Sequence, residues 1–116
     1  NRGTKRYEKE SCDLNNRNKQ SDPGSELYKA ILKLTSVEEC YDFFADLCTV
    51  PELKAMEQRF EVAKLLNDGL IYNDILEKTG ASSATISRVN RSLNYGTGAY
   101  REIFARLKDE DAEETP

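Results

Sequence analysis

The sequence contains no histidine and only three cysteines, Cys12, Cys40 and Cys48. Histidine is the commonest general base and the commonest metal ligand, so its absence argues against a catalytic or metal-binding protein. Cys40 and Cys48 would lie roughly 12 Å apart along a helix, too far for a disulfide. Three scattered cysteines alone make a poor zinc site. We therefore expect no metal, no cofactor and reduced thiols, as in a cytoplasmic protein.

Long apolar runs and catalytic motifs are also missing. No stretch of eighteen apolar residues occurs, and no basic start precedes an apolar segment, so we expect neither a membrane span nor a signal peptide. The sequence has no glycine-rich phosphate loop and no paired carboxylates in an apolar setting. No partner that would activate a cysteine nucleophile is evident. We expect that the protein is not an enzyme.

Charge is unevenly distributed along a chain whose formal net charge is -4. Residues 82–108 carry 5 basic groups and 1 acidic group, whereas residues 109–116 carry 5 acidic groups and no basic one. Residues 26–81 are also acidic in balance, and residues 1–25 are slightly basic. Because phosphate responds to local rather than overall charge, residues 82–108 are the candidate surface for nucleic acid.

The chain divides into three segments. Residues 1–24 are polar and aperiodic, which predicts a flexible arm. This arm either has no role or adds phosphate contacts, and its mixed charges favour the first interpretation. Residues 25–108 have apolar residues at helical spacing, which predicts one all-α domain. Residues 109–116 form an acidic tail.

Six helices are expected between Ser25 and the acidic tail. Ser36 with Glu39, and Thr49 with Glu52, have the spacing of capping boxes, and glycines at 69, 80, 96 and 98 interrupt the pattern. The apolar stripes are wide for about 85 structured residues, which a chain this small covers poorly by itself. We therefore expect a homodimer in which helices before Leu66 and after Gly98 cross between subunits.

Residues 72–93 have the pattern of a helix-turn-helix. A short helix is expected from about Tyr72 to Thr79, a turn at Gly80, and a second helix from about Ser83 to Leu93, capped by Ser82 or Ser83. In the second helix, Ile86, Val89 and Leu93 would share the buried face. The opposite face would carry Ser83, Thr85, Ser87, Arg88, Asn90 and Arg91.

That opposite face favours contact with duplex DNA. No carboxylate occurs between Ser82 and Tyr100, and hydroxyls, an amide and guanidinium groups suit base edges and phosphates. The alternative is an ordinary helical hairpin with a solvated face, but such faces usually mix both signs of charge. A related alternative is a helical protein-interaction module that keeps the fold without reading DNA, which the acidic helices and tail allow.

The stretch from about Leu47 to Phe104 resembles the Trp repressor family, in particular its YerC/YecD-type branch. The resemblance rests on QRFEVAKLL at residues 58–66, TGAS at 79–82 and, most specifically, ATISRVNRSL at 84–93. It implies a six-helix fold, an intertwined dimer, and entry of the second motif helix into the major groove. By resemblance, the DNA-facing positions are Ser82, Ser83, Ala84, Thr85 and Ser87.

The resemblance also bears on a small-molecule effector. In the Trp repressor, the indole of tryptophan lies between two arginines, and a glycine after the second one leaves room for the ring. Arg59 and Arg88 match the two arginines, the former only if one residue is dropped between Gly69 and Gly80. Two polar groups that hold the amino acid are matched by Thr49 and Ser92. Val89 stands where the glycine is expected, so we predict that tryptophan is not the corepressor. A smaller or differently shaped effector between the arginines is the alternative.

Overall fold

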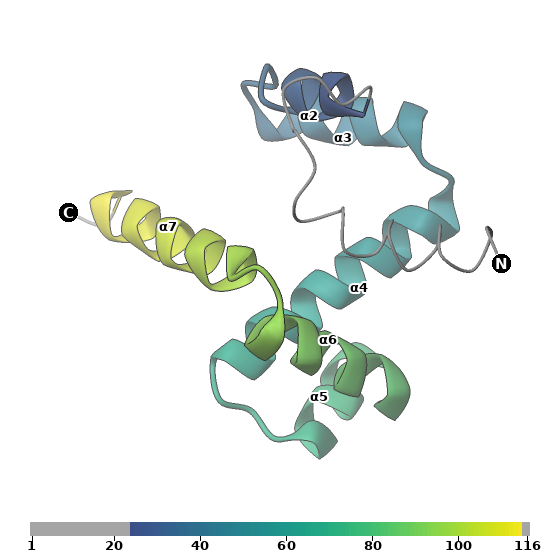
Figure 1. Ribbon diagram of the computed structural model, residues 1–116, viewed down its shortest axis with the longest axis vertical. Coiled ribbons are helices and arrows are strands. Elements are labelled where there is room, and N and C mark those ends of the chain that lie inside the picture. The colour runs from purple at the N-terminus through teal and green to yellow at the C-terminus, as the bar shows by residue number, and fades with distance from the viewer. Residues whose placement is uncertain (1–23, 115–116) are drawn as a thin grey trace, which may run out of the picture. The chain divides into compact units, whose positions relative to one another are not determined.

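The computed structural model describes residues 24–114, and every regular element in that range is a helix. The helices are α2 (Ser25–Ile31), α3 (Val37–Leu47), α4 (Val50–Asn67), α5 (Tyr72–Thr79), α6 (Ser83–Tyr95) and α7 (Ala99–Glu114) (Figure 1). The six expected helices are therefore confirmed. The predicted flexible arm lies outside the described residues except for Gly24. The helices belong to two compact units, one ending at Leu47 and the other beginning at Cys48.

The unit that contains α2 and α3 buries no large apolar side chain among its described residues. Leu32 is 83% exposed, and Val37 and Tyr41 are 66% and 68% exposed. Phe43 and Phe44 form an edge-to-face pair, and their ring centroids are 5.6 Å apart. The apolar stripes that the sequence predicted are present on these helices, but their side chains are largely uncovered.

The start of α3 shows a variant of the predicted capping box. The amide of Glu39 donates to the hydroxyl of Ser36 at 3.1 Å, as expected. The carboxylate of Glu39 accepts from the amide of Thr35 at 2.9 Å, rather than from that of Ser36. The predicted capping box is therefore confirmed in the bond from the Glu39 amide to Ser36. It was wrong in the reciprocal bond, which the Glu39 carboxylate accepts from Thr35 instead of Ser36.

The predicted capping box at the start of α4 is complete. The amide of Glu52 donates to the Thr49 hydroxyl at 3.3 Å, and the Glu52 carboxylate accepts from the Thr49 amide at 2.8 Å. The bond from the Thr49 backbone, and next the bond with its side chain, lower the pKa of the Glu52 carboxyl. Pro51 in the first turn lacks an amide hydrogen that would otherwise be unsatisfied there. These features fix where α4 begins.

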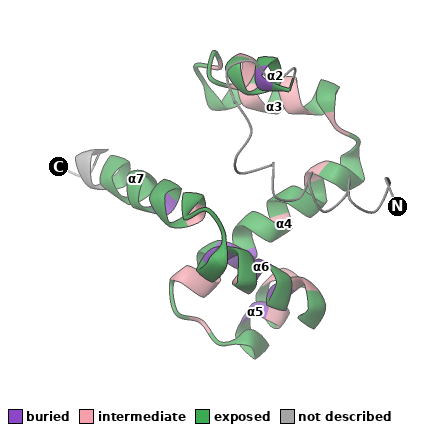
Figure 2. Ribbon diagram, in the orientation of Figure 1, coloured by how far each residue is buried: buried purple, intermediate pink, exposed green. Residues whose placement is uncertain are grey.

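The core of the second unit brings together residues from α4, α5, α6 and α7 (Figure 2). Helix α4 packs against both α5 and α6 and also contacts α7. The buried apolar residues are Val62, Ala63, Ile75, Ala81, Ile86, Val89, Leu93 and Phe104. Partly buried Leu65, Leu66, Leu70, Leu76 and Tyr100 pack around them. Helix α4 is thus central to this unit.

The bounds of α5 agree with the sequence prediction, whereas α6 and α7 are longer than expected. Helix α6 continues two residues beyond Leu93, and the amide of Gly96 bonds to the Ser92 carbonyl at its end. The prediction placed the end of α6 at about Leu93, two residues early, because the last buried apolar residue was taken as the last helical one. Helix α7 runs through Glu114, so most of the acidic segment that begins at residue 109 is helical.

Candidate nucleic-acid interface

Helices α5 and α6 form a helix-turn-helix around Gly80. This glycine has φ +71°, a left-handed conformation that an L side chain rarely adopts, and its amide bonds to the Leu76 carbonyl at 2.9 Å. The next residue, Ala81, is 2% exposed and packs into the core. The predicted turn residue therefore ends α5, and the following small residue anchors the turn.

A threonine and a glutamine connect this turn to the helices beside it. The hydroxyl of Thr79 donates to the Ile75 carbonyl at 2.7 Å and accepts from the Ala81 amide at 3.1 Å. The side-chain amide of Gln58 on α4 donates to the Thr79 carbonyl at 3.2 Å. Gln58 was not singled out from the sequence, because a hydrogen bond across 21 residues leaves no local pattern.

Ser82 is the N-cap of α6. Its hydroxyl accepts from the Thr85 amide at 3.1 Å and donates to the Thr85 hydroxyl at 3.0 Å. The choice between Ser82 and Ser83 as cap is thus decided for Ser82. The cap leaves the positive end of the helix dipole at an exposed surface with no acidic residue in the first turn. An anion such as a DNA phosphate is favoured at that position.

The two faces of α6 differ in burial as the sequence pattern predicted. Ile86, Val89 and Leu93 are 0%, 3% and 5% exposed and belong to the core. Among the predicted DNA-facing residues, the exposed ones are Ser82, Ser83, Ala84, Ser87, Arg88 and Arg91, and the half-buried ones are Thr85 and Asn90. The candidate residues therefore lie on one accessible side of a helix whose other side is anchored.

The exposed side of α6 is positively charged. Within the described part of the chain, no carboxylate pairs with Arg88 or Arg91. The first acidic residue after α6 is Glu102, and it pairs with Arg106 of its own helix at 3.2 Å. The guanidinium groups of Arg88 and Arg91 are therefore accessible to solvent or to a polyanion, on the side of α6 that also carries the hydroxyls of Ser83 and Ser87.

The residues predicted to hold an effector are spread over three different environments. Thr49 caps α4, and Arg59 is exposed on that helix. Arg88 and Ser92 are exposed on α6. Val89 is buried beside Ile86 and Leu93, so its side chain occupies core volume. An effector site formed by these side chains stays a prediction.

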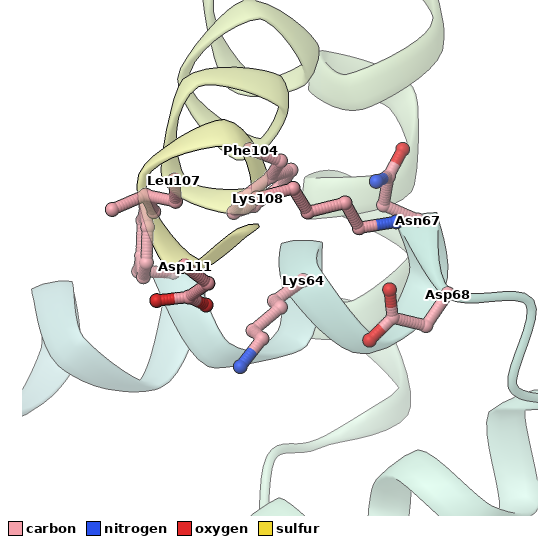
Figure 3. Close-up of a pocket in the computed structure, with 8 residues that line it drawn as sticks. Lys64, Asn67, Asp68, Phe104, Leu107, Lys108 and Asp111 are labelled. Carbon is pink, nitrogen blue, oxygen red and sulfur yellow. The ribbon is translucent and has the colours of Figure 1, made fainter. Parts of the chain in front are cut away.

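A groove of about 230 Å³ lies elsewhere, between α4 and α7 (Figure 3). Its apolar lining comes from Phe60, Phe104 and Leu107, and the rings of Phe60 and Phe104 are 5.2 Å apart. Its polar lining consists of Lys64, Asn67, Asp68, Lys108 and Asp111. None of the predicted effector residues lines this groove.

The described residues also bear on other kinds of site. No group of three or more His, Cys, Asp or Glu side chains among them is arranged to hold a metal ion. No helix in that range is both long and apolar enough to cross a membrane. Cys40 and Cys48 are free and half-buried, and Cys12 lies outside the described residues.

The family relationship follows from comparison with known proteins. The family model for the Trp repressor protein matches residues 25–108. The chain belongs to the Trp repressor family. Protein YerC of Bacillus subtilis, itself uncharacterized, is 50% identical over 88 residues, which cover 76% of this chain and 85% of YerC. The predicted membership, including the YerC-type branch, is therefore confirmed.

Solved structures confirm the all-α Trp-repressor-like fold. The crystal structure of a TrpR-like protein from Eubacterium eligens has a TM-score of 0.74 and 54% identity, covering 79% of this chain and 96% of that one. A Staphylococcus aureus protein assigned to the Trp repressors has a TM-score of 0.71 and 51% identity, covering 72% and 84% of the two chains. The family is one of DNA-binding regulators, and it is not an enzyme family.

Proposed function

We propose that this Trp repressor family member binds duplex DNA sequence-specifically as a homodimer and acts as a transcriptional repressor in the cytoplasm. The observation that carries the proposal is the exposed side of α6. It presents hydroxyls and two arginines without a carboxylate, while the other side is buried in the core. Arginine and serine side chains of this kind read base edges in the major groove and contact phosphates.

Binding to genomic fragments at several salt concentrations tests the proposal. Neutralised phosphates release counterions, so the affinity should fall steeply between about 50 and 200 mM salt, and a subset of fragments should be retained at the higher salt. In a gel-shift assay, the double variant that carries both Arg88→Glu and Arg91→Glu should no longer retard the DNA fragments. Absence of any salt-dependent shift with the wild type would contradict DNA binding.

The second candidate function is a helical protein-interaction module. It is favoured by α3, whose exposed acidic residues are Glu38, Glu39, Asp42 and Asp46, and by the acidic end of α7. These surfaces would repel DNA and attract a basic partner. Capture of proteins that survives nuclease treatment and depends on the α3 carboxylates, together with failure of the gel shift, would favour this function.

The homodimer is supported by apolar surface that each unit leaves uncovered. Leu32 and Tyr41 are largely exposed in the first unit, and Met56 and Phe60 are 36% and 40% exposed in the second. Large apolar side chains left exposed in this number favour burial in a protein–protein interface. A two-fold dimer would present two α6 helices to successive major grooves, roughly 34–36 Å apart, so the DNA site should be an imperfect palindrome.

Solution mass tests the dimer. We expect about twice the 13.2 kDa of the chain at micromolar concentration. Leu32→Lys should shift the mass toward that of a monomer, because it places a charge in the proposed interface. Thr35→Lys adds the same charge nearby at an exposed polar residue and should leave the dimer intact. A wild-type protein with the mass of a monomer would rule out the dimer.

We propose further that the regulator works without tryptophan. Val89 fills volume in the core. By the resemblance, it stands where the Trp repressor has the glycine that leaves room for the indole ring. A smaller effector held between Arg59 and Arg88, with help from Thr49 and Ser92, remains the alternative. Calorimetric titrations with L-tryptophan, with and without DNA, distinguish tryptophan dependence from its absence.

A further inference from the structure

One guanidinium group joins the ends of three helices in the second unit. Arg101 lies in the first turn of α7, and its Nη1 donates to Oδ1 of Asn67 at 2.8 Å. Its Nη2 donates to Oδ1 of Asn94 at 2.7 Å. Asn67 is the last residue of α4, and Asn94 lies in the last turn of α6. The planar fork of arginine suits such a bridge, because two fixed donors point to two separate acceptors.

The amide of Asn94 is itself fixed in orientation. Its Nδ2 donates to the backbone carbonyl of Asn90 and to Oδ1 of Asn90, both at 3.0 Å. The oxygen of the Asn94 amide is therefore directed to Arg101. The hydrogen bonds form a continuous chain from Asn67 through Arg101 and Asn94 to Asn90, which lies next to Arg91 on the candidate DNA-reading helix.

These bonds act where apolar packing ends. Leu93 is the last buried residue of α6, and Tyr95 after it is 86% exposed. The segment that follows contains Gly96 and Gly98, the latter with φ +88°, so it imposes little side-chain constraint on the path to α7. Leu93 anchors the final turn of α6 to the core, and the part of that turn beyond Leu93 is connected to α4 and α7 through the hydrogen bonds of Arg101.

We propose that Arg101 is a positioning residue for DNA recognition, which fixes the C-terminal turn of α6 against α4 and α7. The inference rests on the proposed DNA-binding function. Base contacts require the recognition helix in one orientation, whereas contacts between charged side chains and phosphates tolerate a looser one. Loss of the bridge should therefore weaken binding to the specific site more than binding to unrelated DNA.

Arg101→Met is the informative variant, because it removes the fork and keeps an unbranched apolar chain. Arg106→Met is the matched control, since Arg106 is an exposed arginine of the same helix that bonds to Glu102, one turn away on α7 itself. Both variants lose one positive charge. We expect the affinity of Arg101→Met for the best-bound genomic fragment to fall roughly 2- to 10-fold beyond that of Arg106→Met, at equal affinity for unrelated DNA.

The ratio of specific to non-specific affinity separates positioning from a loss of stability. A larger unfolded fraction lowers both affinities by the same factor and leaves their ratio unchanged. An unchanged ratio in Arg101→Met, with the wild type binding its fragment normally, would overturn the positioning role while the proposed function stands.

Hydrogen exchange on the free protein tests the link without DNA. The Gly96 amide bonds to the Ser92 carbonyl in the last turn of α6, so it should exchange faster in Arg101→Met and in Asn94→Ala than in the wild type. In the double variant it should exchange no faster than in either single variant, because both changes break the same link. Unchanged exchange would overturn the proposal. If the variants exchange faster but the wild type binds no DNA, the bridge holds α6 as described. The proposed function is then overturned, and the recognition role of Arg101 with it.

Discussion

The side-chain amide of Gln58 on α4 donates a hydrogen bond to the backbone carbonyl of Thr79, the last residue of α5, at 3.2 Å. The last carbonyls of a helix have no partner within the helix, so this bond satisfies a group that is partly buried. It also attaches the turn of the helix-turn-helix directly to the central helix of its unit.

Gln58→Ala should therefore lower the free energy of unfolding by about 1 kcal/mol, because it leaves the Thr79 carbonyl unpaired. Denaturant titration measures the change. The neighbouring residue Glu57 is exposed, and Glu57→Ala should stay within about 0.5 kcal/mol of the wild type. Equal stabilities of the two variants would show that water replaces the Gln58 bond at no cost.

Local signals in the sequence predicted much of the fold. The Thr49 capping box, the glycine at residue 80 and the 3- and 4-residue spacing of apolar side chains act over a single helical turn, so they can be read from neighbouring residues. The bounds of α5 and the buried face of α6 follow from them. The family resemblance in residues 84–93 supplied what periodicity could not, namely which fold these helices form.

The remainder depended on contacts between residues far apart in the chain. The bonds of Arg101 to Asn67 and Asn94, like that of Gln58 to Thr79, join different helices and have no signature in local spacing. The end of α6 was placed two residues early because Leu93 is its last buried residue, and the helix continues through Asn94 and Tyr95 beyond the apolar stripe. Phe60, which lies on the part of the chain expected to cross between subunits, is 40% exposed in the single chain.

Arg91 should contact a phosphate rather than a base. It is exposed on the carboxylate-free side of α6 and lies three residues beyond Arg88. Arg91→Ala should weaken binding to all DNA sequences alike and reduce the slope of log affinity against log salt by about 1. Ser83→Ala and Ser87→Ala should instead alter sequence preference, at about 1–3 kcal/mol for each hydrogen bond to a base that is removed. An unchanged salt slope in Arg91→Ala would exclude its phosphate contact.

The capping box of α4 should make stability depend on pH in the acid range. Bonds from the Thr49 backbone and side chain lower the pKa of Glu52 from its ordinary value of 4.5. A carboxylate whose pKa is lower in the folded state contributes its full stabilisation above the unfolded value, and loses it as the pH falls through the folded value. The contribution of Glu52 should therefore be complete at neutral pH and decline below about pH 4.5.

Unfolding free energies between about pH 7 and pH 3 measure this contribution. Glu52→Gln should be less stable than the wild type at neutral pH, and the difference should shrink as the pH falls. Glu57→Gln removes another exposed carboxylate of the same helix without touching the cap and serves as the control. A constant difference between Glu52→Gln and the wild type across the range would contradict a lowered pKa.

Val89 should be a core residue whose side chain a bound tryptophan ligand cannot displace. Its side chain is 3% exposed and packs with Ile86 and Leu93 against α4. Val89→Gly removes this burial and places a glycine inside a helix, so it should lower the free energy of unfolding by about 3 kcal/mol. Thermal or denaturant unfolding measures the loss, and calorimetry of the wild type with L-tryptophan should give no heat of binding.

Ser92→Gly separates the two causes of that loss. Ser92 is exposed on the same helix, so its replacement carries the cost of a helical glycine with no loss of core packing, about 0.5 kcal/mol. The larger effect of Val89→Gly then measures the volume that Val89 fills. If Val89→Gly were no less stable than Ser92→Gly, the position would be free to admit a ring. Micromolar binding of L-tryptophan by the wild type, with tighter binding of DNA, would likewise show that Val89 moves aside for the ligand.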